Sequence, residues 1–187
     1  MPAKTVRKKA PVRRKTAAKK NSPTRLRAYL MLVSVAGLVL FLDQWTKHWV
    51  RQNLSLGEDW MPWEQLAPYA RILHWQNTGA AFGMFQEAGG VFAILAIFVA
   101  AMIVYYFPRL GPGDWALRLA MSLQLGGALG NLIDRLQHGS VTDFISVGTF
   151  PIFNIADSSI SLGVIILLLD VWLNRNRQDG QAQVAPG

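Results

Sequence analysis

The stretch AYLMLVSVAGLVLFLDQWTKHWV, residues 28–50, decides the fold. About 20 mainly apolar residues are enough for a helix to cross a hydrocarbon core of about 30 Å. A basic run precedes this stretch, as in a signal peptide, but the run is unusually long and LFLDQWTKH (residues 40–48) offers no small-x-small cleavage site. The sequence therefore predicts a retained transmembrane helix.

Three further stretches approach the same length: AGGVFAILAIFVAAMIVYYF (88–107), WALRLAMSLQLGGALGNLI (115–133) and IADSSISLGVIILLLDVWL (155–173). The expected fold class is an all-α integral membrane protein with four transmembrane helices. In the third stretch small residues recur every four positions, at Ser122, Gly126 and Gly130. Such a stripe lets another helix approach closely.

The charge distribution predicts the domain organisation and the orientation in the membrane. Residues 1–27 contain 11 of the 19 Lys and Arg residues and no Asp or Glu, so we expect a disordered, basic tail. The positive-inside rule places this tail in the cytoplasm, and four crossings return the C-terminal tail, residues 174–187, to the same side. Residues 28–173 then form the membrane domain. Nucleic-acid binding is the rival interpretation of the basic run, but beside a membrane segment we favour an anchor on anionic lipid.

The two longer connections, 51–87 and 134–154, are then extracytoplasmic. ARILHWQNTGAAFGMF (70–85) is typical of a strand that enters an Asn-Thr-Gly turn, and GSVTDFISVGTFPIF (139–153) alternates as one or two strands do. We therefore expect a small extracytoplasmic β-sheet.

Ionisable side chains in a membrane protein are candidate functional residues, since they are costly to place there. Asp43 and Lys47 are spaced as a helical ion pair, which is a structural explanation for both. Asp134 and Arg135 end the third stretch, and because they are adjacent on a helix each needs another partner. For Asp134 a structural and a catalytic role remain equally open.

Two more acids lie near the same membrane face. Asp143 lies in a predicted strand, and Asp157 opens the fourth stretch, where it could simply be a first-turn acid or N-cap. The topology brings Asp134, Asp143 and Asp157 together. Two close carboxylates share a proton, so that one can act as a base and the other as an acid on a water molecule.

Other chemistry fits less well. The chain has no cysteine, and none of its three histidines lies in an H-E-x-x-H motif, so we expect no metal and no cofactor. Ser158 and Ser159 lack a G-x-S-x-G elbow and are interpreted as first-turn hydrogen bonders. Two non-proteolytic hypotheses remain: a small transporter or channel that couples protons through these acids, and a membrane assembly protein without catalysis.

Five motifs in this order resemble one family, the lipoprotein signal peptidases (bacterial signal peptidase II aspartyl proteases). They are DQWTK (43–47), NTGAAFG (77–83), GGALGNLIDR (126–135), VTDFI (141–145) and FNIADSS (153–159). The resemblance extends from about Asp43 to Leu169. It implies a four-helix membrane enzyme whose extracytoplasmic sheet forms a cradle for the substrate.

The resemblance also implies the reaction and its residues. The substrate would be a diacylglyceryl-modified prolipoprotein, cleaved on the N-terminal side of the lipidated cysteine. Asp143 and Asp157 would be the catalytic pair, and Asp134 a supporting acid that holds Arg135 or neighbouring backbone. The other implied supporting or substrate-binding residues are Asn77, Asn131, Arg135, Asn154, Asp43, Lys47 and Gly130. Gly126, Gly127 and Gly130 would permit close packing or passage of the signal helix and the lipid.

The expected location is the bacterial cytoplasmic (inner) membrane, with several crossings, cytoplasmic termini and an active site at the periplasmic face. The expected partners are prolipoprotein substrates and membrane lipids, without nucleic acid, and the expected state is a monomer. The tail of residues 1–27 is longer than the family usually has, and the resemblance gives no role for it.

Overall fold

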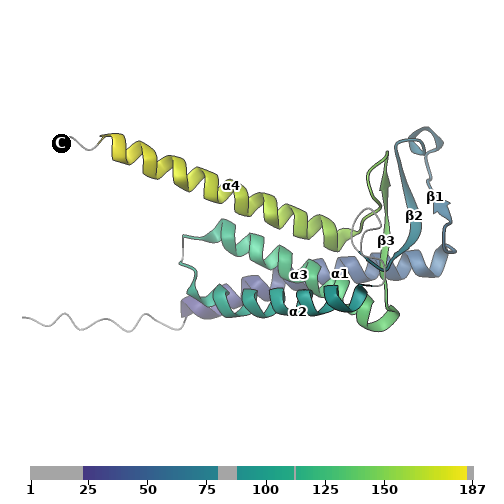
Figure 1. Cartoon of the computed structure of the whole chain (residues 1–187), viewed down its shortest axis with the longest axis horizontal. Coiled ribbons are helices and arrows are strands. Elements are labelled where there is room, and N and C mark those ends of the chain that lie inside the picture. Colours follow the sequence, from purple (N-terminus) through teal and green to yellow (C-terminus); the bar gives the residue numbers. More distant parts are fainter. Residues whose placement is uncertain (1–22, 80–87, 112, 185–187) are drawn as a thin grey trace, which may run out of the picture.

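The computed structural model describes residues 23–79, 88–111 and 113–184. This part of the chain contains four long helices and a three-stranded sheet (Figure 1). The helices are α1 (Pro23–Asn53), α2 (Gly89–Tyr106), α3 (Trp115–His138) and α4 (Ile155–Val184). Each corresponds to one of the four expected spans, and α2 is one residue shorter than its span at either end.

Some boundaries differ from the expected ones. Helix α1 begins at Pro23, before the expected boundary at residue 28, and α4 continues beyond residue 173. Residues 1–22 of the expected tail, residues 185–187 and residues 80–83 of the NTGAAFG motif lie outside the described residues.

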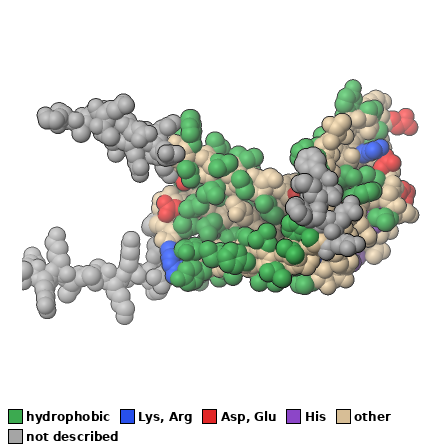
Figure 2. Space-filling view, in the orientation of Figure 1, with side chains coloured by type: hydrophobic (Ala, Val, Ile, Leu, Met, Phe, Trp, Pro, Cys, Tyr) green, Lys and Arg blue, Asp and Glu red, His purple; other side chains and the backbone are tan. Residues whose placement is uncertain are grey.

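Three segments of the described chain are long and apolar enough to cross a membrane: Leu26–Asn53, Gly89–Arg109 and Ile155–Leu173. On the face shown in Figure 2, hydrophobic side chains accordingly cover much of the helical body. Helix α3 has sufficient length but a more polar composition, because it packs against α1, α2 and α4 and exposes less of its surface. The predicted fold class, a helical membrane protein with a small sheet, is confirmed.

Close packing around α3 depends on its small residues. A Cβ atom at Gly126 would lie 2.7 Å from Cβ of Val39 on α1, and one at Gly127 would collide with the carbonyl oxygen of Ala156 on α4. Ser122 is fully buried in the same stripe. The prediction that this stripe admits neighbouring helices is therefore confirmed, and the space beside these glycines is occupied by α1 and α4.

The sheet lies at one end of the helices, where α1 and α3 end and α2 and α4 begin (Figure 1). Its strands are β1 (Asp59–Trp60), β2 (Ala70–Asn77) and β3 (Val141–Val147), antiparallel and in the order β1-β2-β3. The two strands predicted from sequence are β2 and β3. The sequence analysis missed β1, since two residues are too few to show an alternating pattern.

Strand β3 connects the sheet to the helices. Phe144 is buried in a cluster with Val50 and Leu54 at the end of α1. Because successive side chains of a strand point to opposite faces, Asp143 is directed away from this cluster. The packing of one apolar residue thus determines which way the neighbouring carboxylate points.

Candidate active site

A cleft of about 150 Å³ lies between the end of α3, the start of α4 and strand β3. Asp143 and Asp157 both line it, although 13 residues and a change of element separate them in sequence. The polar residues Asn77, Asn131 and Arg135 line the same cleft. Its apolar wall is formed by Val141, Phe150, Pro151, Ile152 and Phe153. Of the three acids predicted to come together at one end of the bundle, Asp143 and Asp157 therefore share this cleft.

Asp143 is 1% exposed and accepts two hydrogen bonds from amide side chains. Nδ2 of Asn154 lies 2.7 Å from Oδ1, and Nδ2 of Asn77 lies 3.0 Å from Oδ2. Burial and the nearby charge of Asp157 raise the pKa of Asp143 to about 7, against the opposing effect of the two amides. Asp143 therefore changes protonation state near neutral pH.

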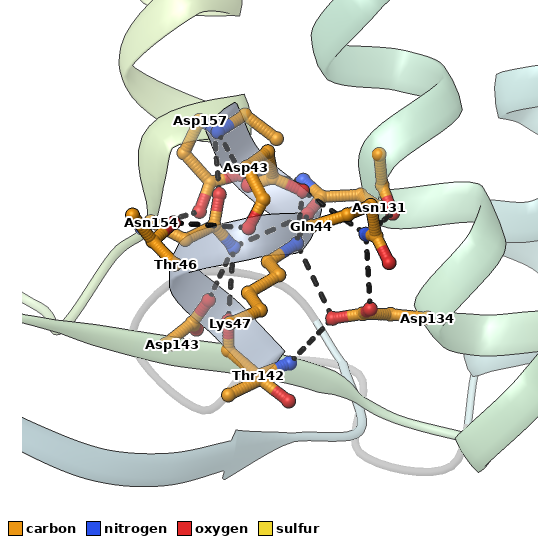
Figure 3. Close-up of polar contacts among 12 residues, drawn as sticks. Asp43, Gln44, Thr46, Lys47, Asn131, Asp134, Thr142, Asp143, Asn154 and Asp157 are labelled. Carbon is orange, nitrogen blue, oxygen red and sulfur yellow. Dashed lines mark hydrogen bonds and ion pairs between the residues drawn. The ribbon is translucent and has the colours of Figure 1, made fainter. Parts of the chain in front are cut away.

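Asp157 lies in the first turn of α4, where Asn154 caps the helix. Oδ1 of Asn154 accepts the N–H of Asp157 at 2.9 Å, and Oδ2 of Asp157 accepts the N–H of Asn154 at 3.3 Å. This reciprocal pair corresponds to a capping box. Asn131 also donates to Oδ1 of Asp157 at 2.7 Å. Asp157 is therefore both an acid in the first turn of α4 and a residue of the cleft. Figure 3 shows where its side chain lies relative to Asn154.

Asn154 connects the two acids. Its side chain is fully buried and contacts Asp143 and Asn131, while its backbone contacts Asp157 (Figure 3). The family resemblance implies a supporting or substrate-binding residue at this position, and the amide NH2 group makes its hydrogen bonds within the protein. Asn154 instead sets the relative placement of the two carboxylates.

Asp134 is fully buried and does not line the cleft. It forms ion pairs with Lys47 at 3.2 Å and Arg51 at 3.4 Å, and its Oδ2 accepts the N–H of Thr142 at 2.9 Å. The structure therefore does not pair it with Arg135, but it does hold nearby backbone, one residue before Asp143. This arrangement accounts for Asp134 as a structural acid.

Arg135 has other contacts. It lines the cleft and donates to the carbonyl oxygen of Gly79 at 3.3 Å, and its guanidinium carbon lies 5.3 Å from the ring centre of Phe92. It thus joins the end of α3 to the residues after β2 and to α2.

The predicted ion pair on α1 is confirmed. Nζ of Lys47 lies 2.8 Å from Oδ2 of Asp43, and both side chains are fully buried. Oδ1 of Asp43 accepts the N–H of Ala156 on α4 at 2.9 Å. Gly130 is required here, because a Cβ atom at this position would lie 2.5 Å from Oδ2 of Asp43.

Sequence reasoning missed two polar residues of α1. Gln44 donates to Asp134 at 3.2 Å, and Arg51 donates to Thr142 at 3.0 Å. A signal for Arg51 was available, since residues 43, 47 and 51 recur every four positions and so share a helix face.

The described residues contain no group of three or more His, Asp or Glu side chains that could hold a metal ion. Ser158 donates to the carbonyl oxygen of Asn154 at 2.9 Å, and Ser159 to that of Ala156 at 2.8 Å. Both serines therefore make the first-turn hydrogen bonds expected of them.

The fold and the cleft together define a class: a helical membrane protein with two carboxylates in a cleft at one end of its bundle. Comparison with known proteins narrows this class. The family model described as Signal peptidase (SPase) II matches residues 35–173. The lipoprotein signal peptidase of Shewanella loihica is 38% identical over 170 residues, covering 87% of this chain and 95% of the relative. That of Shewanella woodyi is 39% identical over 153 residues, covering 78% and 82%.

Solved structures agree with these matches. A bacterial membrane enzyme structure determined in meso at 2.3 Å resolution is 32% identical, with a TM-score of 0.73, and the match covers 78% of this chain and 90% of that one. A second, determined in the same way at 1.9 Å, is 33% identical with a TM-score of 0.67, covering 75% and 91%. The chain belongs to the signal peptidase II family, and it is a membrane peptidase.

Proposed function

We propose that Asp143 and Asp157 are the catalytic pair with which this peptidase removes signal peptides from prolipoproteins. The observation that carries the proposal is the shared cleft, in which Asn154 holds both carboxylates. Asn77 on β2 also donates to Asp143, and Asn131 on α3 also donates to Asp157. Within the described residues the cleft has no metal cluster, and Ser158 and Ser159 do not line it. Carboxylate-activated water is the chemistry that these side chains support best.

The two acids have different roles. Asp143 is the more buried, with a pKa near 7, so at neutral pH it can keep the shared proton and act as the acid. Asp157 accepts the amide N–H of Asn131 and lies in the first turn of α4, where the helix dipole stabilises a negative charge. Asp157 is therefore the base.

The reaction follows from this assignment. Asp157 takes a proton from a water molecule, whose oxygen adds to the carbonyl carbon of the scissile peptide, while Asp143 donates its proton to the carbonyl oxygen. The tetrahedral intermediate then returns a proton to Asp143. The C–N bond breaks as Asp157 delivers its proton to the leaving nitrogen. Both carboxyl groups end in their starting states.

The substrate is a prolipoprotein with a diacylglyceryl-modified cysteine, cleaved on the N-terminal side of that cysteine. Asn77 and Arg135 line the cleft at the end of β2 and α3. Their N–H groups can donate to the carbonyl oxygens of an extended segment, which need partners at a membrane face. The lipid remains in the bilayer beside the apolar helices, so membrane lipids surround the complex.

The membrane domain, residues 28–173, lies in the bacterial inner membrane as a monomer. Its basic N-terminal segment is cytoplasmic, as is its C-terminus, so the sheet end of the bundle carries the cleft at the periplasmic face. This position separates the peptidase from a proton-coupled transporter, whose acids belong near the middle of the bilayer.

The test replaces Asp143, Asp157 and Asp134 singly with Asn and measures cleavage of a lipidated prolipoprotein in membranes. Asp143→Asn and Asp157→Asn are expected to lose at least about 1,000-fold in rate. Asp134→Asn is expected to lower the melting temperature more than the rate per folded molecule. Full cleavage by either of the first two variants, once membrane insertion is verified, would exclude the pair.

A further inference from the structure

We propose that Lys47 is a positioning residue for the reaction, which orients the carboxylate of Asp157 through the side-chain amide of Asn131. The proposal rests on the proposed function, since it takes Asp157 as a catalytic residue. Nζ of Lys47 contacts Asp43, Asp134 and Asn131 rather than either carboxylate of the cleft, and Lys47 does not line the cleft. The charge of Lys47 acts on Asp143 at a distance, and its hydrogen bonds reach Asp157 through Asn131.

The position of the Lys47 ammonium group is fixed by a buried cluster of charges. Asp43, Lys47, Arg51 and Asp134 form this cluster, which we call the α1 ion cluster. Its two acids and two bases balance in formal charge. The side chains of Asp43, Lys47 and Asp134 are all fully buried. An ammonium group held at 2.8 Å and 3.2 Å by two carboxylates has little freedom to move.

The ammonium group determines which way the amide of Asn131 points. Lysine has only donors, so its contact at 2.9 Å requires the oxygen Oδ1 of Asn131. Nδ2 of Asn154 donates to the same oxygen at 3.1 Å. The nitrogen of Asn131 is thereby turned toward Asp157 and donates to its Oδ1 at 2.7 Å. If the amide were rotated, its NH2 group would face two donors and its oxygen would face a carboxylate.

The contacts thus form a directed chain from α1 through α3 to α4: Lys47, Asn131, Asp157 (Figure 3). The same cluster also reaches the other acid. Asp134 accepts the N–H of Thr142, the residue before Asp143 on β3. A structural ion cluster alone would not need an amide whose two ends contact Lys47 and Asp157. The chain therefore links the cluster to the geometry of the base.

The variant that tests the chain is Asp43→Asn combined with Lys47→Met. It removes one acid and one base together, so the cluster stays balanced, and the Asn oxygen can still accept the N–H of Ala156. The expected result is a loss of kcat of about 10- to 100-fold, as small misplacements of catalytic groups produce, with KM changed less than about twofold. Thr46→Val is the matched control, because the Thr46 hydroxyl bonds to the backbone carbonyl oxygens of Leu42 and Asp43 on its own helix. This variant should retain full activity.

A double-mutant cycle separates positioning from general support. If Lys47 acts through Asn131, then adding Asp43→Asn and Lys47→Met to the Asn131→Ala protein will lower its kcat by less than about twofold. Additive losses in the cycle would overturn the proposal. If the protein with Asp43→Asn and Lys47→Met does not fold, Asn131→Asp provides the second test. It keeps oxygen acceptors for Lys47 but has no N–H for Asp157, so it should lose about as much activity as Asn131→Ala.

The pH dependence of kcat/KM distinguishes positioning from a simple loss of folded protein, which leaves the shape of the profile unchanged. Removal of the amide donor shifts the acid limb of kcat/KM to higher pH, whereas an inactive fraction lowers the profile equally at every pH. Asp143 on β3, Arg135 on α3 and Lys47 on α1 interact electrostatically with one another or with Asp157, and all three are unchanged in Asn131→Ala. An unshifted acid limb in Asn131→Ala would contradict the proposal. Activity retained by Asp157→Asn would refute the proposed function itself, so the two failures are distinguishable.

Discussion

Replacing Asn77 with alanine is expected to move the alkaline limit of activity upward. Asn77 donates to Oδ2 of Asp143 at 3.0 Å and so favours the ionised carboxylate. A hydrogen bond to a charged group contributes about 1.5 kcal/mol, and one pKa unit corresponds to about 1.4 kcal/mol. Loss of the amide should therefore raise the pKa of Asp143 from about 7 to about 8.

The alkaline limit moves upward because Asp143 acts as the acid. Only its protonated form is active, so the wild-type kcat/KM declines as the pH rises above about 7. At about pH 8 roughly a tenth of the wild type and roughly half of the variant remain protonated, a difference of about fivefold after each profile is scaled to its maximum. Scaling removes any uniform loss of substrate affinity.

The assay is cleavage of a lipidated peptide in detergent micelles, followed over a pH series. Gln76→Ala is the control, because Gln76 is the exposed neighbour of Asn77 on β2 and pairs in register with Thr142. Its profile should match the wild type. An alkaline limb that does not move in Asn77→Ala, or an activity that rises through neutral pH, would refute the assignment of Asp143 as the acid.

Three further outcomes are expected. Gly130→Ala should destabilise the protein by roughly 1–3 kcal/mol, because the new Cβ atom clashes with Asp43. Gly37→Ala is the control: its Cβ atom would lie in open space, so it should be neutral or stabilising by up to about 1 kcal/mol. Thermal unfolding of the two variants measures the difference. Because burial raises the pKa of Asp143 to about 7 from 3.8, the folded state retains a proton that the unfolded chain has released, so stability falls as pH rises through that window. Asp143→Asn should abolish this pH dependence, which amounts to at most about 4 kcal/mol in the free energy of unfolding. Denaturant unfolding at several pH values measures it. Deletion of residues 1–22 should leave cleavage by the inserted protein unchanged, and a rate loss above about tenfold would give the tail a catalytic role.

Much of the fold could be predicted from the sequence because membrane helices carry a strong local signal. The apolar stretches at 28–50, 88–107 and 155–173 each indicated their helix directly. The third stretch, 115–133, was recognisable by its length and its small residues, although its polar residues reduce its hydropathy. Strand β1 had no such signal, because its two residues are ordered by pairing with β2 rather than by their own pattern.

The site was predictable in part, for a different reason. Topology predicted that Asp134, Asp143 and Asp157 lie near one membrane face, and the family motifs then selected Asp143 and Asp157. The i, i+4 spacing predicted the pair of Asp43 and Lys47. The partners of Asp134 were not predictable, because Lys47 and Arg51 lie more than 80 residues away and meet it only through helix packing. Long-range contacts of this kind leave no periodic trace in one sequence.

Single-turnover cleavage by the Asp157→Asn protein tests the central claim most directly. The purified variant, shown to be folded, is mixed in excess with a diacylglyceryl-modified prolipoprotein, and the released signal peptide is followed over time. The pair mechanism predicts a rate at least about 1,000-fold below the wild type, because the variant lacks the base that activates water. Cleavage at more than about a tenth of the wild-type rate would show that water is activated by another group, and would contradict the assignment of Asp157.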